Sequence, residues 1–386
     1  MSAKPTSANR PAAKLSGLIA TPDGALIRGK ITFSDRVTAL EPASDGGGED
    51  YILPGFIDLQ VNGSHGIDVM NASADALAAL SRHLAREGTT AWMPTAVTAP
   101  IEKIAQVHES IASAIENSRR TDSADEAAVL AMHLEGPFIS PLRLGAHPAL
   151  NLEPRGDAFE RVLAMHALRL ITLAPELPGG IDAIRRLTAR AVVVSIGHTN
   201  ATLEEANAAV AAGARMFTHL FNAMRSLNHR DPGVIAAALA PSPALAAIIP
   251  DGVHVHPAIL RLACRARGKD AMILVTDKVA LAKKTSASEK NAGRARGSIT
   301  IRDGAARLDD GTLAGSIISM LDGVRVMVEK VGVSVGDAAV MAATNPANLV
   351  GAGDRGRIQV GARADLIVLS PTLELKSVFI SGRELS

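Results

Sequence analysis

One glutamate and two histidines of this chain have the types and positions needed to hold a catalytic metal ion. Glu135, His198 and His219 each stand at the end of a short, largely apolar run. A carboxylate and two imidazoles supply three ligands and leave a fourth position open for water, which is the arrangement of catalytic zinc sites. Either histidine alone is explained as well by a hydrogen bond inside the core. The three residues together favour a metal site.

Asp277 is the residue that could move a proton beside such a metal. It is the only charged residue in the run 272–277 (MILVTD). Burial would raise the pKa of its carboxyl group and a nearby cation would lower it, so the group could accept a proton near neutral pH. A helix N-cap or a buried ion pair is the structural alternative.

Two amides decide how many metal ions the sequence predicts. Gln60 and Asn62 occupy the positions where many metal-dependent barrel hydrolases carry a His-x-His pair. Amide groups are poor ligands for zinc. We therefore expect one divalent metal ion per chain rather than two, with zinc as the first choice and iron, cobalt or manganese as alternatives.

Four other histidines carry weaker signals. His147 stands in a loop after the third predicted strand, and His254 follows an Asp-Gly turn, so either could face a substrate. His256 is expected on the surface. His65 lies in a glycine-rich loop and is expected to be structural or to face solvent.

These residues lie far apart in the sequence, so a fold must bring them together. The middle of the chain alternates eight β-rich runs with alanine-rich helical stretches, which predicts an α/β fold with parallel strands and right-handed crossovers. Eight such strands close a (β/α)8 TIM barrel, whose active site lies where the carboxyl ends of the strands converge. A doubly wound open sheet is the alternative, although no Gly-x-x-x-x-Gly-Lys-Ser/Thr motif supports a nucleotide-binding version. The predicted strands are 56–60, 90–95, 129–135, 169–175, 192–198, 216–219, 246–251 and 272–277.

The two ends of the chain differ from this middle part. Residues 15–52 and 357–384 contain short alternating stretches separated by Gly and Asp, which is typical of small β structures. Residues 1–14 are expected to be a loose tail.

Composition excludes several classes of partner. The chain has 40 Lys and Arg against 39 Asp and Glu, a net charge of +1, so nothing favours a nucleic acid or an anionic membrane as partner. The single Cys264 excludes an intramolecular disulfide and a Cys-rich metal site. No stretch reaches the ~20 apolar residues of a membrane span. The polar start lacks a signal-peptide pattern, so we expect a cytoplasmic protein.

Eight short motifs make the chain similar to the N-acetylglucosamine-6-phosphate deacetylases, a branch of the amidohydrolase superfamily. They follow one another over about residues 51–383, and together they are far more specific than any one alone. That family combines the barrel with a small β-sandwich domain built from both chain ends. We therefore expect residues 1–53 and 351–386 to form the sandwich and residues 54–350 the barrel. The motifs start at Pro54, His133, Gly197, Thr218, Asp251, Val275, Leu313 and Asn345 (PGFIDLQVNG, HLEGPF, GHTNA, THLFNAM, DGVH, VTD, LAGS and NPA).

The resemblance implies a role for each candidate. Glu135, His198 and His219 hold the metal ion, and Asp277 is the catalytic acid and base. The implied reaction converts N-acetyl-D-glucosamine 6-phosphate to D-glucosamine 6-phosphate and acetate, in amino-sugar catabolism or cell-wall recycling. The enzyme is expected to be a homodimer in which Arg230 reaches the phosphate in the neighbouring subunit's site. The residues implied in substrate binding are Gln60, His147, Asn222, Ala223, Arg230, His254 and Leu313.

The segment after Asp277 departs from the family pattern. The family has Ala and a short loop rich in Pro and Gly, whereas this chain has Lys278 followed by the longer segment 279–290. Lys278 could lower the pKa of Asp277, contact an anion or point away from the site. Two rival functions stay open: deacetylation of N-acetylgalactosamine 6-phosphate or another amide, and sugar-phosphate binding without catalysis.

Overall fold

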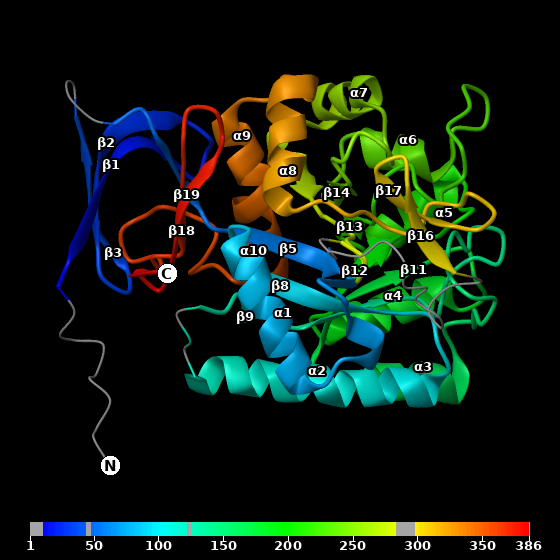
Figure 1. The fold of residues 1–386 in the computed structure, drawn as a ribbon. Helices are drawn as coiled ribbons and strands as arrows, with labels where there is room; N and C mark the ends of the chain where they lie inside the picture. The colour runs from blue at the N-terminus through cyan, green and yellow to red at the C-terminus, as the bar shows by residue number, and fades with distance from the viewer. Residues whose placement is uncertain (1–10, 44–47, 122, 124, 283–297, 386) are drawn as a thin grey trace, which may run out of the picture.

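The computed structural model describes residues 11–43, 48–121, 123, 125–282 and 298–385. Its main unit is a barrel of parallel strands surrounded by helices (Figure 1), which confirms the predicted TIM barrel. Neighbouring strands pair in the order β15-β14-β13-β12-β11-β10-β8-β5, and the short β9 pairs with β8. These strands are β5 (Phe56–Val61), β8 (Thr89–Val97), β9 (Ala128–Val129), β10 (Met132–Glu135), β11 (Leu168–Leu173), β12 (Val193–Ile196), β13 (Met216–Phe217), β14 (Leu245–Ile248) and β15 (Met272–Leu274).

The barrel closes between its first and last strands through irregular backbone contacts, which we call the seam. β15 ends at Leu274, and the amide of Asp277 then donates to the carbonyl of Gln60 on β5 over 2.9 Å. The next residue, Lys278, forms a parallel bridge with Val61. The seam therefore lies at the carboxyl ends of the strands, beside the predicted proton-transfer residue.

Helices connect successive strands, and side-chain caps fix where several of them begin. Ser73 caps α1 by accepting from the amide of Ala76, and Thr202 and Glu205 form a capping box at the start of α5. The α-helices are α1 (Ala74–Arg86), α2 (Ile101–Thr121), α3 (Gly156–Leu163), α4 (Gly180–Ala189), α5 (Leu203–Ala212), α6 (Gly233–Leu239), α7 (Pro257–Arg267), α8 (Met320–Arg325), α9 (Val335–Ala339) and α10 (Asn345–Val350). Short 3-10 turns η2 (Val69–Asn71) and η3 (Lys269–Ala271) and π-helical segments η4 (Val326–Val331) and η5 (Val340–Thr344) complete the set.

The amino- and carboxyl-terminal parts of the chain meet in one seven-stranded sheet beside the barrel (Figure 1). The sheet folds over on itself, because Phe33 of β2 and Phe379 of β19 stand four places apart in the strand order and still make an edge-to-face ring contact at 5.3 Å. The predicted small β domain therefore forms from both ends, while its boundaries at 53/54 and 350/351 stay a prediction. Its strands are β1 (Ala13–Ala20), β2 (Leu26–Phe33), β3 (Val37–Pro42), β4 (Tyr51–Pro54), β18 (Leu366–Leu369), β19 (Leu375–Ile380) and β20 (Arg383–Glu384).

Two small hairpins lie at the carboxyl-terminal end of the barrel strands. β6 (Gly63–Ser64) and β7 (Ile67–Asp68) follow β5, and β16 (Ile299–Arg302) and β17 (Ala305–Leu308) follow β15. The second hairpin turns at Asp303-Gly304, both in the left-handed region, as a tight two-residue turn requires. Its buried face packs with Val279 and Leu281 in a small apolar cluster of its own.

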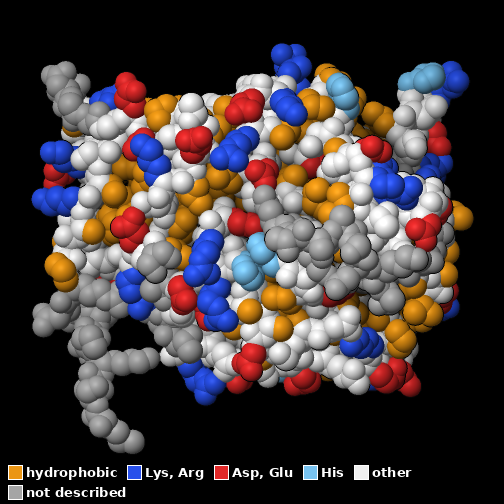
Figure 2. Space-filling view, viewed as in Figure 1, with side chains coloured by type: hydrophobic (Ala, Val, Ile, Leu, Met, Phe, Trp, Pro, Cys, Tyr) orange, Lys and Arg blue, Asp and Glu red, His pale blue; other side chains and the backbone are white. Residues whose placement is uncertain are grey.

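The surface matches the near-neutral composition. Lys and Arg side chains alternate with Asp and Glu over the face drawn in Figure 2, and hydrophobic side chains there are scattered in small groups. Among the described residues, every helix is too short or too polar to cross a bilayer.

Candidate active site

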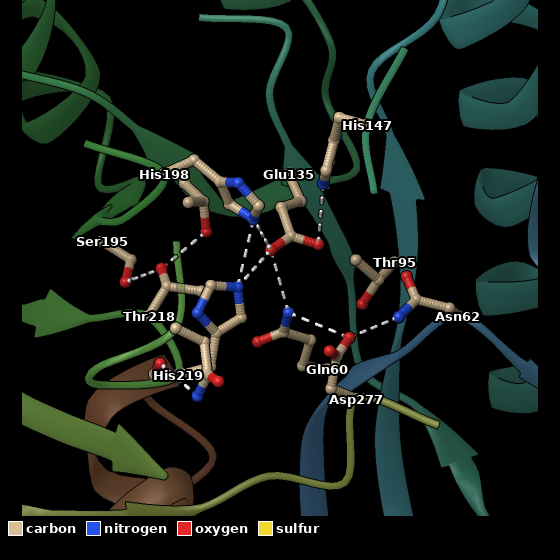
Figure 3. A network of polar contacts seen from close by, with 12 residues as sticks. Gln60, Asn62, Thr95, Glu135, His147, Ser195, His198, Thr218, His219 and Asp277 are labelled. Carbon is tan, nitrogen blue, oxygen red and sulfur yellow. Dashed lines mark hydrogen bonds and ion pairs between the residues drawn. The ribbon is translucent and has the colours of Figure 1, made fainter. Parts of the chain in front are cut away.

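The three predicted metal ligands converge at the carboxyl ends of their strands. Glu135 is the last residue of β10, and His198 and His219 each follow the end of their strand, β12 or β13, by two residues. The Oε1 atom of Glu135 lies 3.1 Å from Nε2 of His198 and 2.9 Å from Nε2 of His219, and the two nitrogens are 3.2 Å apart (Figure 3). All three side chains are buried.

This set fits a divalent cation. Two ligands that each lie ~2.0–2.1 Å from a tetrahedral zinc ion are about 3.3 Å apart, close to the separations observed here. The carbonyl of Arg143 can only accept, so the Nδ1 atom of His198, 2.9 Å away, carries the proton and leaves Nε2 with its lone pair. Burial opposes the charge on Glu135, but the surrounding His147, His198 and His219 hold the pKa of its carboxyl well below the usual range. The Nε2 atoms of two imidazoles and one carboxylate oxygen therefore face one point.

Asp277 faces the same place from the seam. Its Oδ1 atom accepts from the amide nitrogens of Asn62 at 2.5 Å and Gln60 at 3.2 Å, and Gln60 also donates to Oε1 of Glu135 at 3.1 Å (Figure 3). Burial and the negative charge of Glu135 raise the pKa of the Asp277 carboxyl from 3.8 to about 6. A carboxylate with that pKa can accept a proton at neutral pH and return it.

Two more predicted histidines are held in fixed orientations. The Nδ1 atom of His147 shares a hydrogen bond with the hydroxyl of Thr98 at 2.8 Å, and its Nε2 atom lies 3.7 Å from Oε2 of Glu135. Burial lowers the pKa of His147 to about 4, so this imidazole is neutral. His254 places Nδ1 2.6 Å from Oδ2 of Asp251, which leaves its Nε2 edge for another partner.

These groups line a cavity of about 340 Å³. The barrel contributes its charged and polar wall, the turn after His219 contributes Phe221, Asn222 and Ala223, and the segment after β17 contributes Leu313. The titratable side chains thus come from the ends of the barrel strands, and the side wall of the cavity comes from loops. The residues around it are Asn62, Val97, Glu135, Gly145, Ala146, His147, His198, His219, Phe221, Asn222, Ala223, Ile249, His254, Asp277, Val279, Ile299, Thr312, Leu313, Ala314 and Gly315.

Several site residues have a backbone conformation that side chains other than Gly rarely adopt. The φ angles are 47° for His198, 27° for His219 and 49° for Asp277, all in the left-handed region. Such conformations cost of order 1–3 kcal/mol each and cluster at functional sites. The left-handed conformation bends the chain after β12, β13 and β15, where these three residues stand.

Two predicted substrate contacts do not reach the cavity wall. Gln60 lies behind it and connects Glu135 to Asp277. Arg230 lies in the exposed segment 226–231, outside the cavity of its own chain. A surface ion pair with the neighbouring Asp231 would be a purely structural role for Arg230. Asp231 pairs with Arg225 instead.

The structure also decides between the readings of Lys278, His65 and His256. The Lys278 side chain points away from the cavity and pairs with Glu87. His65 is structural, since its ring stacks on that of His83 with centroids 4.0 Å apart. His256 caps α7 and is exposed, as expected.

Some residues that shape the site could not be recognised from the sequence. Thr98, which orients His147, and Arg143, whose carbonyl orients His198, are loop residues of common types. Asp58 is fully buried beneath Gln60 and accepts from the hydroxyl of Thr276 at 2.5 Å. Asp58 differs from these two residues, because a carboxylate within the largely apolar run of β5 is visible in the sequence.

Comparisons with known proteins agree with this geometry. The model of the Amidohydrolase family matches residues 51–385, and the chain belongs to that family of metal-dependent hydrolases. The N-acetylglucosamine-6-phosphate deacetylase of Bacillus subtilis is 37% identical over 336 residues, 85% of this chain and 82% of the relative. The N-acetylgalactosamine-6-phosphate deacetylase of Escherichia coli O157:H7 is 36% identical over 338 residues, 86% of this chain and 87% of the relative.

A solved structure supports the same grouping. A mutant of N-acetyl-D-glucosamine-6-phosphate deacetylase from Mycobacterium smegmatis, in complex with N-acetyl-D-glucosamine-6-phosphate, superposes with a TM-score of 0.86. The two chains are 31% identical, and the match covers 97% of this chain and 99% of the other.

Proposed function

We propose that this protein is a deacetylase that hydrolyses N-acetyl-D-glucosamine 6-phosphate to D-glucosamine 6-phosphate and acetate. The observation that carries the proposal is the convergence of Glu135, His198 and His219 within 3.2 Å of one another, with Asp277 facing them across one cavity. The relatives from Bacillus subtilis and Mycobacterium smegmatis support the choice of reaction.

Asp277 performs the proton transfers in this proposal. Glu135, His198 and His219 would hold a divalent ion, which when bound would supply Lewis acidity, lowering the pKa of water to ~7 and polarising the acetyl carbonyl. Asp277 takes the proton of the attacking water and returns it to the amide nitrogen as the C–N bond breaks. Its Oδ1 atom already accepts from Gln60 and Asn62, and the described residues donate no hydrogen bond to Oδ2. Oδ2 is therefore the atom assigned to the proton.

The neighbouring side chains are assigned to substrate binding. His147, neutral and fixed by Thr98, faces Glu135 and would donate to the substrate near the reacting amide. His254 would contact the sugar, and Asn222, Ala223 and Leu313 line the wall where the sugar phosphate would extend. Gln60 is reassigned from substrate binding to orienting the two carboxylates, because it lies behind the cavity wall.

We propose one divalent ion per chain, zinc by preference. The three ligands are imidazole and carboxylate groups, which suit zinc, while iron, cobalt and manganese accept the same donors. The amides Gln60 and Asn62 occupy the positions that a second ion would need, and both donate hydrogen bonds to carboxylates here. An amide can bind a metal ion only through its oxygen, and it is a poor ligand for zinc.

We also propose a homodimer in which Arg230 completes the partner's phosphate site. Among the described residues no carboxylate pairs with the Arg230 guanidinium, which is suited to bidentate binding of a phosphate. The same end of the barrel exposes Leu142 and Leu227, at 71% and 53% of their full surface, and a dimer contact would cover such side chains. The cytoplasmic location expected from the sequence stays a prediction.

The test is acetate release by purified protein from a host strain that lacks its own deacetylase. The substrates are N-acetylglucosamine 6-phosphate, N-acetylgalactosamine 6-phosphate and unphosphorylated N-acetylglucosamine, with elemental analysis of the same sample. We expect kcat/KM to be highest for the first substrate. No acetate from any of them with metal-loaded protein would contradict the proposal and favour a binding protein. A preference for the second would assign the activity of the Escherichia coli relative instead.

A further inference from the structure

Lys278 is a buried cation beside the proposed proton-transfer residue. Its side chain is 1% exposed, and its ammonium group pairs with the carboxylate of Glu87, which is 14% exposed. A buried ammonium group is costly unless a counter-charge and hydrogen bonds satisfy it. The lysine lies directly after Asp277, yet the two side chains point in opposite directions, Asp277 into the cavity and Lys278 out towards α1.

The backbone of Lys278 holds the barrel seam. Its carbonyl accepts from the amides of Asn62 and Gly63 at 2.9 and 3.1 Å, and its own amide donates to the hydroxyl of Thr276 at 3.3 Å. Asn62 is also the residue whose side chain donates to Asp277 Oδ1 at 2.5 Å. A shift of Lys278 would therefore move both Asp277 and the amide that orients it.

Glu87 anchors the other end of this contact. It is the C-cap residue of α1, where the helix dipole disfavours a negative charge, so an isolated carboxylate would gain little from that position. Its Oε1 atom lies 4.0 Å from Nε2 of His65, in the loop that follows β5. The ion pair thus connects α1, the loop after β5 and the residue after Asp277.

We propose that the Lys278–Glu87 ion pair is a positioning device that fixes the seam and so sets the Asp277 carboxylate for proton transfer. This inference rests on the proposed deacetylase function. Asp277 has a left-handed backbone conformation, which persists only when the surroundings enforce it. Backbone bridges of Lys278 with Val61 and Ser316 hold the main chain of the seam, and the buried ion pair adds a side-chain constraint from α1.

The first test replaces Lys278 by Met. The side chain stays long and unbranched, and the positive charge is removed. A misplacement of about 1 Å at a reacting group costs roughly 10²-fold in rate, so we expect kcat to fall by roughly 10–10²-fold. KM for N-acetylglucosamine 6-phosphate and the metal content per chain should stay unchanged. Glu87→Gln removes the same ion pair from its other end and should give a similar fall, so the test does not depend on one variant folding.

A double-mutant cycle separates positioning from general damage. If Lys278 acts through Asp277, Lys278→Met should change the residual rate of Asp277→Asn by less than about twofold, because the group it positions is already gone. Arg355→Met is the control, since Arg355, 14% exposed, pairs with Asp365, 1% exposed, just before β18, so the exposures match those of the Lys278–Glu87 pair with the acid and the base exchanged. That variant should lower the melting temperature and keep kcat.

The inference is wrong if Lys278→Met leaves kcat unchanged, lowers it equally in the Asp277→Asn background, or empties the metal site. A wild-type protein that releases no acetate would contradict the proposed function instead. In that case a crystal structure of Lys278→Met would still test the positioning role of the ion pair. Asp277 and Asn62 at their original separation in that structure would refute it.

Discussion

Replacing Asp277 by Asn should lower turnover by ~10²–10⁴-fold and at the same time stabilise the metal-free protein. The substitution keeps the shape of the side chain and an oxygen that accepts from Gln60 and Asn62, so the site should stay in place. It removes the group that carries the proton. Loss of a general acid–base typically costs ~10²–10⁴-fold, which corresponds to about 3–5 kcal/mol of transition-state stabilisation.

The stability gain follows from the pKa. Burial, followed by the charge of Glu135, raises the pKa of Asp277 from 3.8 to about 6, so the folded protein binds this proton more tightly than the unfolded chain. The contribution of Asp277 to wild-type stability therefore falls as the pH rises from near 4 to near 6 and then stays lower by about 3 kcal/mol, at 1.36 kcal/mol per pKa unit. Asp277→Asn has no such titration and should be more stable by up to that amount above pH ~6.

Urea unfolding of metal-free wild type and variant, at about pH 7.5 and about pH 4.5, measures this difference. The gain should be present at the higher pH and small at the lower one. Acetate release from metal-loaded samples gives kcat. A variant that is less stable than wild type at the higher pH and keeps above about a tenth of the wild-type kcat would refute both roles of Asp277.

Three further predictions test other parts of the site. Glu135→Gln should lose its metal ion to a chelator under conditions in which the wild type keeps about one ion per chain, because an amide is a poor ligand. Two ions per active wild-type chain, found by elemental analysis, would contradict the one-metal site. Arg230→Ala should mainly raise KM, and hybrids of Arg230→Ala with Asp277→Asn protomers should regain activity at low substrate, since each hybrid dimer then contains one intact site. No gain, with hybrids shown to form, would place Arg230 outside the partner's site. Gly315→Ala should lower both the melting temperature and kcat, because the added Cβ would lie 2.6 Å from the Asp277 carbonyl oxygen at a φ of 95°; unchanged values would show that the segment moves freely.

The fold and the convergence of the three proposed metal ligands could be predicted because they depend on pattern alone. Eight β-rich runs with helices between them have few closed arrangements, and in a barrel the strand termini meet on one face. Glu135, His198 and His219 stand at those termini, so their convergence follows from topology rather than from local detail. Their separations of 2.9–3.2 Å show that the three side chains do converge, as the argument from strand ends predicts.

The direction of a side chain at the seam could not be predicted in this way. Lys278 and Asp277 are consecutive, and which of them faces the cavity depends on the contacts of Asp277 with Gln60 and of Lys278 with Asn62. Both contacts come from residues more than 200 positions away, so no local pattern encodes them. The same holds for Gln60, whose amide connects two carboxylates instead of facing the cavity.

The left-handed backbone at His198, His219 and Asp277 explains why this site needs so much support from outside it. Each residue follows a barrel strand and must turn sharply to present its side chain, and none of the three is Gly. The supporting contacts differ in kind: the Arg143 carbonyl orients the ring of His198, and Asn62 and the seam orient Asp277. His219 has no partner for its buried Nδ1 atom among the described residues, so its orientation depends on Glu135, His198 and the turn that follows. Of the two proposed histidine ligands, His219 should therefore be the one whose position changes more when the metal ion is removed.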